Sequence, residues 1–193
     1  MGVNPMTNKV ALIIGAGDAI GSAIVRKFSE RGLTVCATRR NGDKLTSLIN
    51  EIKATGRKAH AFACDARNEE STKELFAKIE NEIGEIEVAV FNIGANVPMG
   101  ILDTDSRKFF KIWEMACFAG FLNGREAAHY MSKRQRGTII FTGATASVRG
   151  AAGFAAFSSA KQGLRAVAQS MARELGPQNI HVAHVIIDAA VDT

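Results

Sequence analysis

The sequence predicts an α/β fold: a doubly wound parallel sheet with helices on both faces, the three-layer αβα arrangement of Rossmann type. Apolar, β-branched runs alternate along the 193 residues with segments of helical periodicity. The runs are apolar at every position, which is typical of parallel strands covered on both faces. The first run leads directly into a glycine cluster. Hydrophobic residues make up 47% of the chain and charged residues 22%. We expect one domain over residues 1–193, with 1–8 as an N-terminal extension.

The elements follow from this alternation and from the residues that mark their ends. Asn68 and Asp105 stand where helix N-caps belong, and glycines follow the expected helix ends. The expected strands are Val10–Ile14, Leu33–Thr38, Lys58–Cys64, Ile86–Phe91, Thr138–Phe141 and Ile180–Ile187. The expected helices are Ala19–Arg31, Asp43–Ala54, Glu69–Ile83, Ser106–Ser132 and Phe154–Leu175.

The glycine cluster after the first strand has the pattern Gly-x-Gly-x-x-x-Gly. Glycines let the backbone come close to a pyrophosphate, and the N-terminus of the following helix faces its charge. Alone, this pattern is a weak signal, because glycine turns between a strand and a helix are common. The residues expected to form the cradle are Gly15, Gly17, Asp18, Ala19, Ile20 and Gly21.

Four further segments follow strands and carry polar or small residues. Ligands of doubly wound sheets bind beyond the carboxyl ends of the strands, so these segments are expected to meet at one edge. They contribute Arg39 and Arg40, Asp65 and Ala66, Asn92 to Gly94, and Thr142 to Ala144.

With these motifs the chain resembles the short-chain dehydrogenase/reductase family over essentially its whole length. The family's Thr-Gly-x-x-x-Gly-x-Gly loop is matched by Ile14–Gly21, with Ile14 in place of threonine and Ala19 in place of the middle glycine. The Asn-Asn-Ala-Gly motif reads Phe91–Gly94, and Tyr-x-x-x-Lys reads Phe157–Lys161. The resemblance implies a nicotinamide-dependent oxidoreductase that acts on a small-molecule carbonyl or alcohol.

The resemblance also implies roles for single residues. Asp65 would contact the adenine, and Lys161 would hold the nicotinamide ribose. The segment Asp188–Thr193 resembles the family's Pro-Gly-x-x-x-Thr, with Asp188 and Ala189 replacing proline and glycine. Relatives continue beyond that threonine, so we expect the C-terminal part, which holds most of the substrate specificity, to be missing here. The cofactor-binding residues expected in addition to those above are Asn92, Gly94, Thr142, Asp188, Val191 and Thr193.

The catalytic tetrad implied by the resemblance is degenerate. Phe157 stands at the tyrosine position, Ala144 at the serine position and Ala116 at the asparagine position, so only Lys161 is retained. General acid catalysis needs a titratable group within hydrogen-bond reach. Tyr130, the one tyrosine, lies near the far end of a long helix and is expected to be a partly buried aromatic.

Other hydroxyls and Lys161 itself leave alternatives open. The nearby hydroxyls are expected to cap helices, bond to the preceding turn or face solvent. Lys161 is expected at the ribose, although a solvated charge is the alternative. The hydroxyls considered as substitutes are those of Thr142, Thr145, Ser147, Ser158 and Ser159.

Arg39 and Arg40 end the second strand, where an acidic residue would favour NAD(H). Guanidinium groups bind phosphate well, so NADP(H) is expected over NAD(H); a pair of exposed surface arginines is the alternative. Asp18 opposes this preference. We hypothesise that it pairs with Arg39 or Arg40 and weakens the phosphate site.

Composition limits the remaining partners. The net charge of +5 is spread out, and its one dense run, Lys133–Arg136, is expected to be a solvated loop, so no nucleic-acid partner is expected. Cys36, Cys64 and Cys117 lack metal-ligand spacing and are expected to be buried free thiols, with no metal site. No run predicts a membrane span or a secretory signal, and a cytoplasmic location is expected.

The sequence leaves two candidate functions and one expected oligomeric assembly. The first function is an NADP(H)-preferring oxidoreductase with impaired or nonstandard proton donation. The alternative is a catalytically inactive nucleotide-binding protein that senses the cofactor or binds a partner. The family resemblance implies a homodimer or homotetramer through the helices Ser106–Ser132 and Phe154–Leu175. Their small and apolar residues are Ala116, Phe118, Phe121, Ala155, Ala156, Leu164, Ala168 and Met171.

Overall fold

The computed structural model describes residues 8–189. Six parallel strands form one sheet in the order β3-β2-β1-β4-β5-β6. The strand order reverses between β1 and β4, which creates the crevice where ligands of such sheets bind. The strands are β1 (Val10–Ile14), β2 (Thr34–Arg39), β3 (Ala59–Ala63), β4 (Ile86–Phe91), β5 (Gly137–Ala144) and β6 (Ile180–Ile187).

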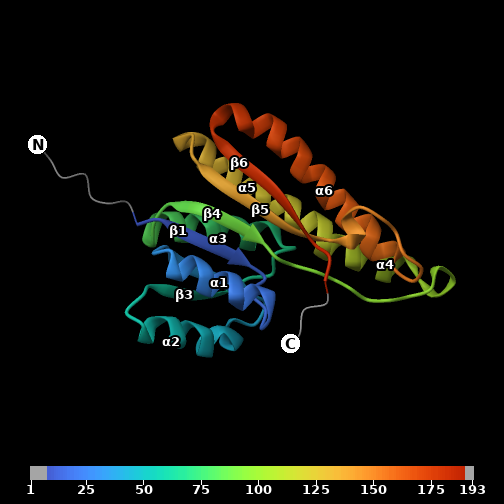
Figure 1. Ribbon diagram of the computed structural model, residues 1–193, viewed down its shortest axis with the longest axis horizontal. Coiled ribbons are helices and arrows are strands. Elements are labelled where there is room, and N and C mark those ends of the chain that lie inside the picture. The colour runs from blue at the N-terminus through green and yellow to red at the C-terminus, as the bar shows by residue number, and fades with distance from the viewer. Residues whose placement is uncertain (1–7, 190–193) are drawn as a thin grey trace, which may run out of the picture.

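The helices lie on both faces of the sheet, as Figure 1 shows. Two of them, α1 and α2, pack on one face over β1 to β3, and α3, α5 and α6 pack on the other. The predicted three-layer αβα architecture is therefore confirmed. The α-helices are α1 (Ile20–Glu30), α2 (Thr46–Ala54), α3 (Glu69–Glu82), α4 (Ser106–Trp113), α5 (Ala119–Arg134) and α6 (Ala155–Leu175).

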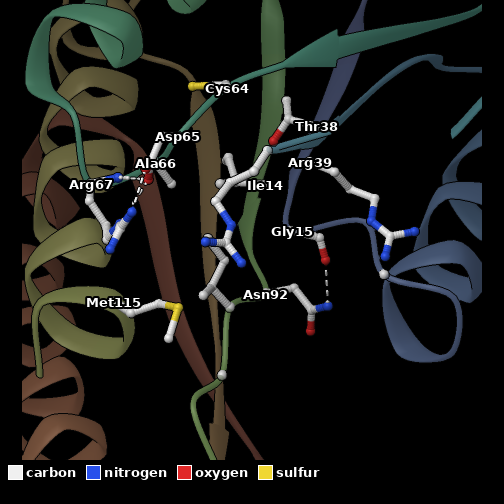
Figure 2. Close-up of a pocket in the computed structure, with 14 residues that line it drawn as sticks. Ile14, Gly15, Thr38, Arg39, Cys64, Asp65, Ala66, Arg67, Asn92 and Met115 are labelled. Atoms are coloured by element: carbon white, nitrogen blue, oxygen red, sulfur yellow. Dashed lines mark hydrogen bonds and ion pairs between the residues drawn. The ribbon is translucent and has the colours of Figure 1, made fainter. Parts of the chain in front are cut away.

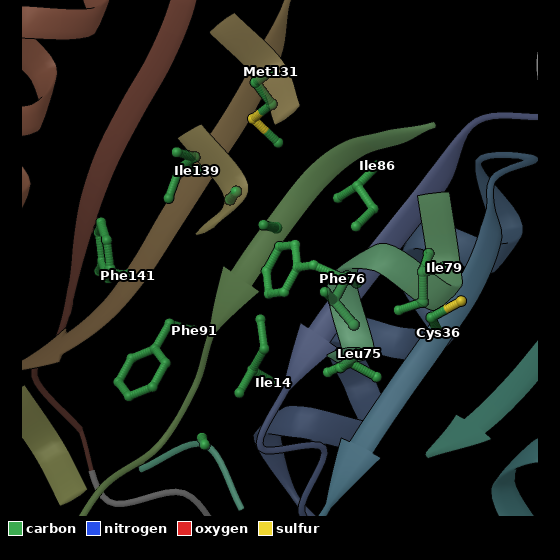
Figure 3. Packing of buried hydrophobic residues seen from close by; sticks show 14 of the residues in the cluster. Ile14, Cys36, Leu75, Phe76, Ile79, Ile86, Phe91, Met131, Ile139 and Phe141 are labelled. Carbon is green, nitrogen blue, oxygen red and sulfur yellow. The ribbon is translucent and has the colours of Figure 1, made fainter. Parts of the chain in front are cut away.

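The core explains why β1 is apolar at every position. Leu12 and Ile14 pack toward α3 and α5, in the cluster that Figure 3 shows, while Ala11 and Ile13 pack toward α1 and α2. All four side chains are at most 1% exposed. Each large apolar side chain buried in this way contributes roughly 1.5–3 kcal/mol of transfer free energy.

Most predicted boundaries agree with the structure to within one or two residues, and three elements differ more. The expected helix Ser106–Ser132 consists of α4 and α5 joined by a five-residue π-helical segment, Glu114–Phe118, and such π turns occur inside otherwise α-helical stretches. The expected helix at Asp43 begins with a 3₁₀ turn, Gly42–Leu45. The strand β5 extends to Ala144, so Thr142 to Ala144 belong to the strand instead of following it.

The basic run Lys133–Arg136, at the end of α5, is not the solvated loop that composition predicts. Arg134 lies in the last turn of α5 and makes an ion pair of 3.0 Å with the buried Glu80 of α3. Arg136 bonds to Glu85 and Glu87 at the start of β4. These carboxylates lie far from the run in sequence, so composition alone gives no sign of them.

Two other features are relevant to the predictions. Cys36, Cys64 and Cys117 are free and buried, as expected, and burial raises the pKa of the Cys36 thiol to about 12. On the α1 side of the sheet, β5 and β6 carry no helix within residues 8–189 (Figure 1), and Val185 is 47% exposed. No helix of this part of the chain is long and apolar enough to span a membrane.

Candidate functional site

The glycine turn brings β1 close to β4. Gly15 has a φ of +85°, and a β-carbon there would lie 2.7 Å from the carbonyl oxygen of Asn92. The Asn92 side-chain amide donates to the Gly15 carbonyl at 3.0 Å (Figure 2). A β-carbon on Gly21 would lie 2.6 Å from the Ala16 α-carbon, whereas one on Gly17 would meet nothing within 4 Å. Gly15 and Gly21 are therefore needed for packing, and Gly17 keeps its side open.

A cavity of about 250 Å³ lies beside this turn at the carboxyl ends of the strands. It brings together eight of the predicted cofactor residues: Gly15, Gly17, Arg39, Arg40, Asp65, Ala66, Asn92 and Gly94. Two other lining residues, Ile14 and Ile93, belong to the predicted motifs without being named as cofactor residues. The remaining lining residues, Thr38, Cys64, Arg67 and Met115, were not predicted at the site. The predicted cofactor residues of the described chain that do not line this cavity are Asp18, Ala19, Ile20, Gly21, Thr142, Lys161 and Asp188.

The structure confirms the pairing proposed for Asp18. Its carboxylate accepts a hydrogen bond from Arg39 at 2.7 Å. The carboxylate is 86% exposed and the Arg39 side chain 22% exposed. Arg40 makes no ion pair within residues 8–189. Arg39 is therefore shared with Asp18, whereas Arg40 can offer its whole guanidinium to a ligand.

Arg67 was missed by sequence reasoning and changes the surroundings of Asp65. Its guanidinium donates two hydrogen bonds to the Asp65 carboxylate, at 2.6 and 2.9 Å (Figure 2). It donates a third to Glu114 at 3.5 Å. The Arg67 guanidinium lowers the pKa of Asp65, so this carboxylate stays ionised. The signal was an arginine two residues after the aspartate, a spacing too common to interpret alone.

Lys161 is not the solvated charge considered as the alternative. It projects from α6, is 3% exposed, and donates to the carbonyl oxygens of Thr142 at 2.8 Å and Ile93 at 3.0 Å. Burial lowers the pKa of its ammonium to about 8. Ile93 lines the cavity, and its backbone carbonyl accepts from the Lys161 ammonium, so the ammonium lies next to the cavity, separated from it by this carbonyl.

The other three tetrad positions lie together in one apolar cluster. Ala116 and Phe157 are buried there, and Ala144 packs against them. The Phe157 ring centroid lies 5.9 Å from the Lys161 nitrogen. The cluster also contains Ala95, Met99, Ile112, Trp113, Met115, Cys117, Ala146, Phe154, Ala156 and Ala160. None of these side chains is a general acid of suitable pKa at neutral pH, because burial also raises the pKa of Cys117.

Most nearby hydroxyls have the structural roles expected of them. Thr142 donates to the Phe91 carbonyl at 3.2 Å, and Ser159 donates to the Ala156 carbonyl of the preceding turn at 2.9 Å. Thr145 donates to the exposed Asp188, which therefore engages the end of β5. Ser158 is the exception: it is 4% exposed, and its hydroxyl meets no partner within residues 8–189. The expectation that it caps, bonds backward or faces solvent is wrong.

Tyr130 lies in α5 and is partly buried, as expected, and burial raises the pKa of its phenol. Val191 and Thr193, the last two predicted cofactor residues, lie outside the described part of the chain.

The residues of the cavity fit a dinucleotide. The open side of Gly17, the start of α1 and the arginines at the end of β2 suit phosphates. The ionised Asp65 and its neighbour Ala66 suit an adenine ring at the end of β3. Asn92 and Gly94 also line the cavity, on either side in sequence of Ile93, whose carbonyl accepts from Lys161.

Comparison with known proteins agrees with this geometry. The family model described as short chain dehydrogenase matches residues 9–193. A 2,3-dihydro-2,3-dihydroxybenzoate dehydrogenase of Bacillus subtilis is 29% identical over 93% of this chain and 69% of its own length. A short-chain dehydrogenase/reductase of Hericium erinaceus is 32% identical over 89% of this chain and 70% of its own length. The chain thus spans about two thirds of these relatives.

Two solved structures extend the comparison. The crystal structure of a short-chain dehydrogenase from Rhodopseudomonas palustris has 55% sequence identity and a TM-score of 0.91, covering 94% of this chain and 85% of that chain. A metagenomic short-chain oxidoreductase in complex with NADP has 28% identity and a TM-score of 0.89, covering 95% and 83%.

Proposed function

Because the chain belongs to the short-chain dehydrogenase family, we propose that it is an NADP(H)-preferring oxidoreductase of a carbonyl or alcohol whose proton delivery is impaired. One observation carries the proposal: a charged nucleotide cavity lies beside an apolar cluster at the positions where proton donors are expected. The bound cofactor would supply or accept a hydride, and the protein would supply position and charge.

The preference for NADP(H) rests on the end of β2. Arg39 and Arg40 line the cavity and carry the charge that suits a 2′-phosphate. An acidic residue, which would repel that phosphate, is absent from both positions. A relative of known structure binds NADP, which agrees with this assignment. Asp18 weakens the preference for NADP(H), since the Arg39 guanidinium must leave the Asp18 carboxylate before it can bond fully to a phosphate.

The chain's own residues would divide the remaining work. The glycine turn and Asn92 fix the backbone against the nucleotide, and Lys161 is positioned to hold the ribose. The Lys161 ammonium is also a cationic acid beside the apolar cluster, 5.9 Å from the Phe157 ring centroid. With Phe157 in place of a phenol, a substrate oxygen there would lack the usual donor, so we expect slow turnover.

The same cluster supports the second candidate, a nucleotide-binding protein without turnover. Phe157 is 8% exposed and Ala116 is fully buried, so these positions are filled by packing and are not open to a substrate. The two candidates share NADPH binding and differ in whether a bound carbonyl compound is reduced.

The test begins with NADPH binding, followed by a survey of aldehydes and ketones for loss of its absorbance. Restoring both groups in Phe157→Tyr with Ala144→Ser should raise the rate strongly. A matched control adds the same atoms elsewhere in the cluster, in Phe154→Tyr with Ala146→Ser, and should leave the rate unchanged. Binding without turnover in the native and restored proteins would favour the second candidate, and absence of NADPH binding would refute both.

For assembly, we propose a homodimer or homotetramer through α4 and α5. A row of four aromatic rings runs along these helices, with neighbouring centroids 6.1–6.3 Å apart: Phe110, Trp113, Phe118 and Phe121. The two end rings, Phe110 and Phe121, are exposed. Ala116, Ala156, Leu164 and Ala168, named for this role from sequence, are instead buried in the chain's own core. Light scattering of native protein and of Phe110→Glu tests the assembly, and a native monomer would refute it.

The free thiols favour a reducing compartment, so we propose the cytoplasm.

A further inference from the structure

His184 of β6 is partly buried, and both of its ring nitrogens are enclosed. Neither Nδ1 nor Nε2 meets a hydrogen-bonding group within residues 8–189. An unpartnered buried polar atom is destabilising, so such an atom calls for a specific explanation. Packing does not supply one, because the residues next to His184 on the same face of β6, Ile180 and Val182, are apolar core residues.

The sheet is shaped to seat this ring. A β-carbon on Gly143, in the neighbouring strand β5, would lie 2.1 Å from the His184 Cε1 atom and 2.6 Å from Nε2. The imidazole therefore lies directly on bare backbone, in a place that only glycine leaves free. The same point is 2.8 Å from the hydroxyl oxygen of Ser147. Nε2 and this hydroxyl are thus close enough for one water molecule to bond to both.

Two serines bring further polar atoms to this layer. The Ser147 hydroxyl, 1% exposed, accepts from the Ala144 backbone at 3.0 Å and keeps its own proton available for donation. Ser158 of α6, also buried, has an unpartnered hydroxyl. It lies one helical turn before Lys161, and residues at this spacing are neighbours on a helix surface. The Ser158 hydroxyl is therefore an unpartnered buried group on the same side of α6 as Lys161.

Lys161 connects this region to the candidate active site. Its ammonium donates to the carbonyl of Thr142, the residue before Gly143, so it lies across one peptide unit from the His184 ring. Burial lowers the pKa of His184, and the charges of Lys161 and Arg165, both on α6, lower it further, which keeps the imidazole neutral near pH 7. A neutral imidazole accepts a proton at one nitrogen while it donates at the other.

We propose that His184, with Ser147, Ser158 and bound water, forms an internal proton relay that reloads Lys161 from solvent. This inference rests on the proposed function only for its use in turnover; the relay itself is a property of the protein without cofactor. It assigns a purpose to the side chains of His184 and Ser158, whose buried polar atoms have no partner within residues 8–189.

The proton balance is simple. In a carbonyl reduction the reduced nicotinamide supplies the hydride to carbon, and the oxygen must gain one proton. Lys161 would give that proton as its N–H bond breaks and the alcohol O–H bond forms. The resulting neutral amine regains a proton through the relay, in which each member receives one proton and passes one on. Bulk water is the final donor, and no electrons move along the relay.

The test is the exchange of the Lys161 ammonium protons with water, measured by nitrogen-edited NMR in the protein without cofactor. Lys161→Met identifies the signal by its loss. In His184→Gln, which cannot relay at both nitrogens, exchange should slow by at least about tenfold, the scale of a lost general base. The matched control is His181→Gln, an exposed histidine on the same strand, which should leave exchange unchanged. Unchanged exchange in His184→Gln would overturn the proposal.

Two further variants keep the test independent of folding and of turnover. Ser158→Ala, a small deletion, should also slow exchange, whereas the exposed neighbour Ser159→Ala should not. Gly143→Ala, which displaces the ring, should reproduce His184→Gln. If NADPH fails to bind, the proposed function fails while the exchange result still stands. If NADPH is oxidised but the exchange rate of the Lys161 ammonium protons is unchanged in His184→Gln, the relay is refuted and the proposed function still stands.

Discussion

Replacing Asp18 by asparagine should tighten NADPH binding and leave NADH binding almost unchanged. The Asp18 carboxylate holds Arg39 at 2.7 Å, and both side chains lie beside the predicted position of the 2′-phosphate. In Asp18→Asn, Arg39 is released to bond to the phosphate, and the repulsion between the carboxylate and the phosphate is removed. NADH lacks that phosphate, so neither gain applies to it.

The magnitude follows from the exposure of the pair. An ion pair between exposed side chains contributes about 0.2–1 kcal/mol, and Asp18 is 86% exposed. Solvent screens the repulsion to a similar size. The two effects together should tighten NADPH by about 3- to 10-fold, since tenfold corresponds to about 1.4 kcal/mol.

Titration with each coenzyme, followed by protein fluorescence at two salt concentrations, measures the change. Glu30→Gln is the control, because it removes the same charge from an exposed pair with Lys27 at the far end of α1. Arg40→Ala should weaken NADPH and spare NADH. Equal changes for both coenzymes in Asp18→Asn, or weaker NADPH binding, would refute the reasoning.

Three predictions concern stability and are checked by urea unfolding. Gly15→Ala combines a positive φ with a contact of 2.7 Å and should cost about 1–3 kcal/mol, while Gly17→Ala, with no neighbour within 4 Å, should cost under about 1 kcal/mol; equal losses would contradict the assigned backbone. Glu80→Gln leaves Arg134 without its buried charge partner and should cost about 2–4 kcal/mol, whereas a loss under about 1 kcal/mol would show that the pair is solvated. For Lys161, burial lowers the pKa to about 8 in the folded protein, so the unfolded chain binds more protons above that pH. The stability of the native protein relative to Lys161→Met should therefore rise by about 3 kcal/mol between pH 8 and 10.5, and a flat difference would mean that the ammonium is solvated.

The sheet could be predicted from sequence because buried parallel strands and glycine-marked helix ends are local signals. The long-range ion pairs of Arg134 and Arg67 could not. Arg134 finds Glu80 more than fifty residues away, and Arg67 joins Asp65 to Glu114 across a similar separation. Long-range pairs leave no periodic pattern in the chain. The π-helical segment Glu114–Phe118 was not predicted either, since the sequence there indicates only one continuous helix.

The candidate site shows the same division. Motif spacing located the cavity, and the charge pattern predicted the pairing of Asp18 with Arg39. The motifs could not show whether the side chains of Lys161 and Ser158 are buried or exposed to solvent. In the structure both are buried, which excludes the solvated alternative for each. The seating of His184 on Gly143 depends on the register between β5 and β6, which no local pattern specifies.

The most direct test is a single-turnover experiment on the preformed NADPH complex, using the aldehyde or ketone that the restored Phe157→Tyr, Ala144→Ser variant reduces fastest. We predict that the native protein binds NADPH to saturation and oxidises it at least about 100-fold more slowly than the restored variant, the scale of a lost general acid. Equal rates in the two proteins would contradict the claim that this coenzyme pocket lacks its proton donor.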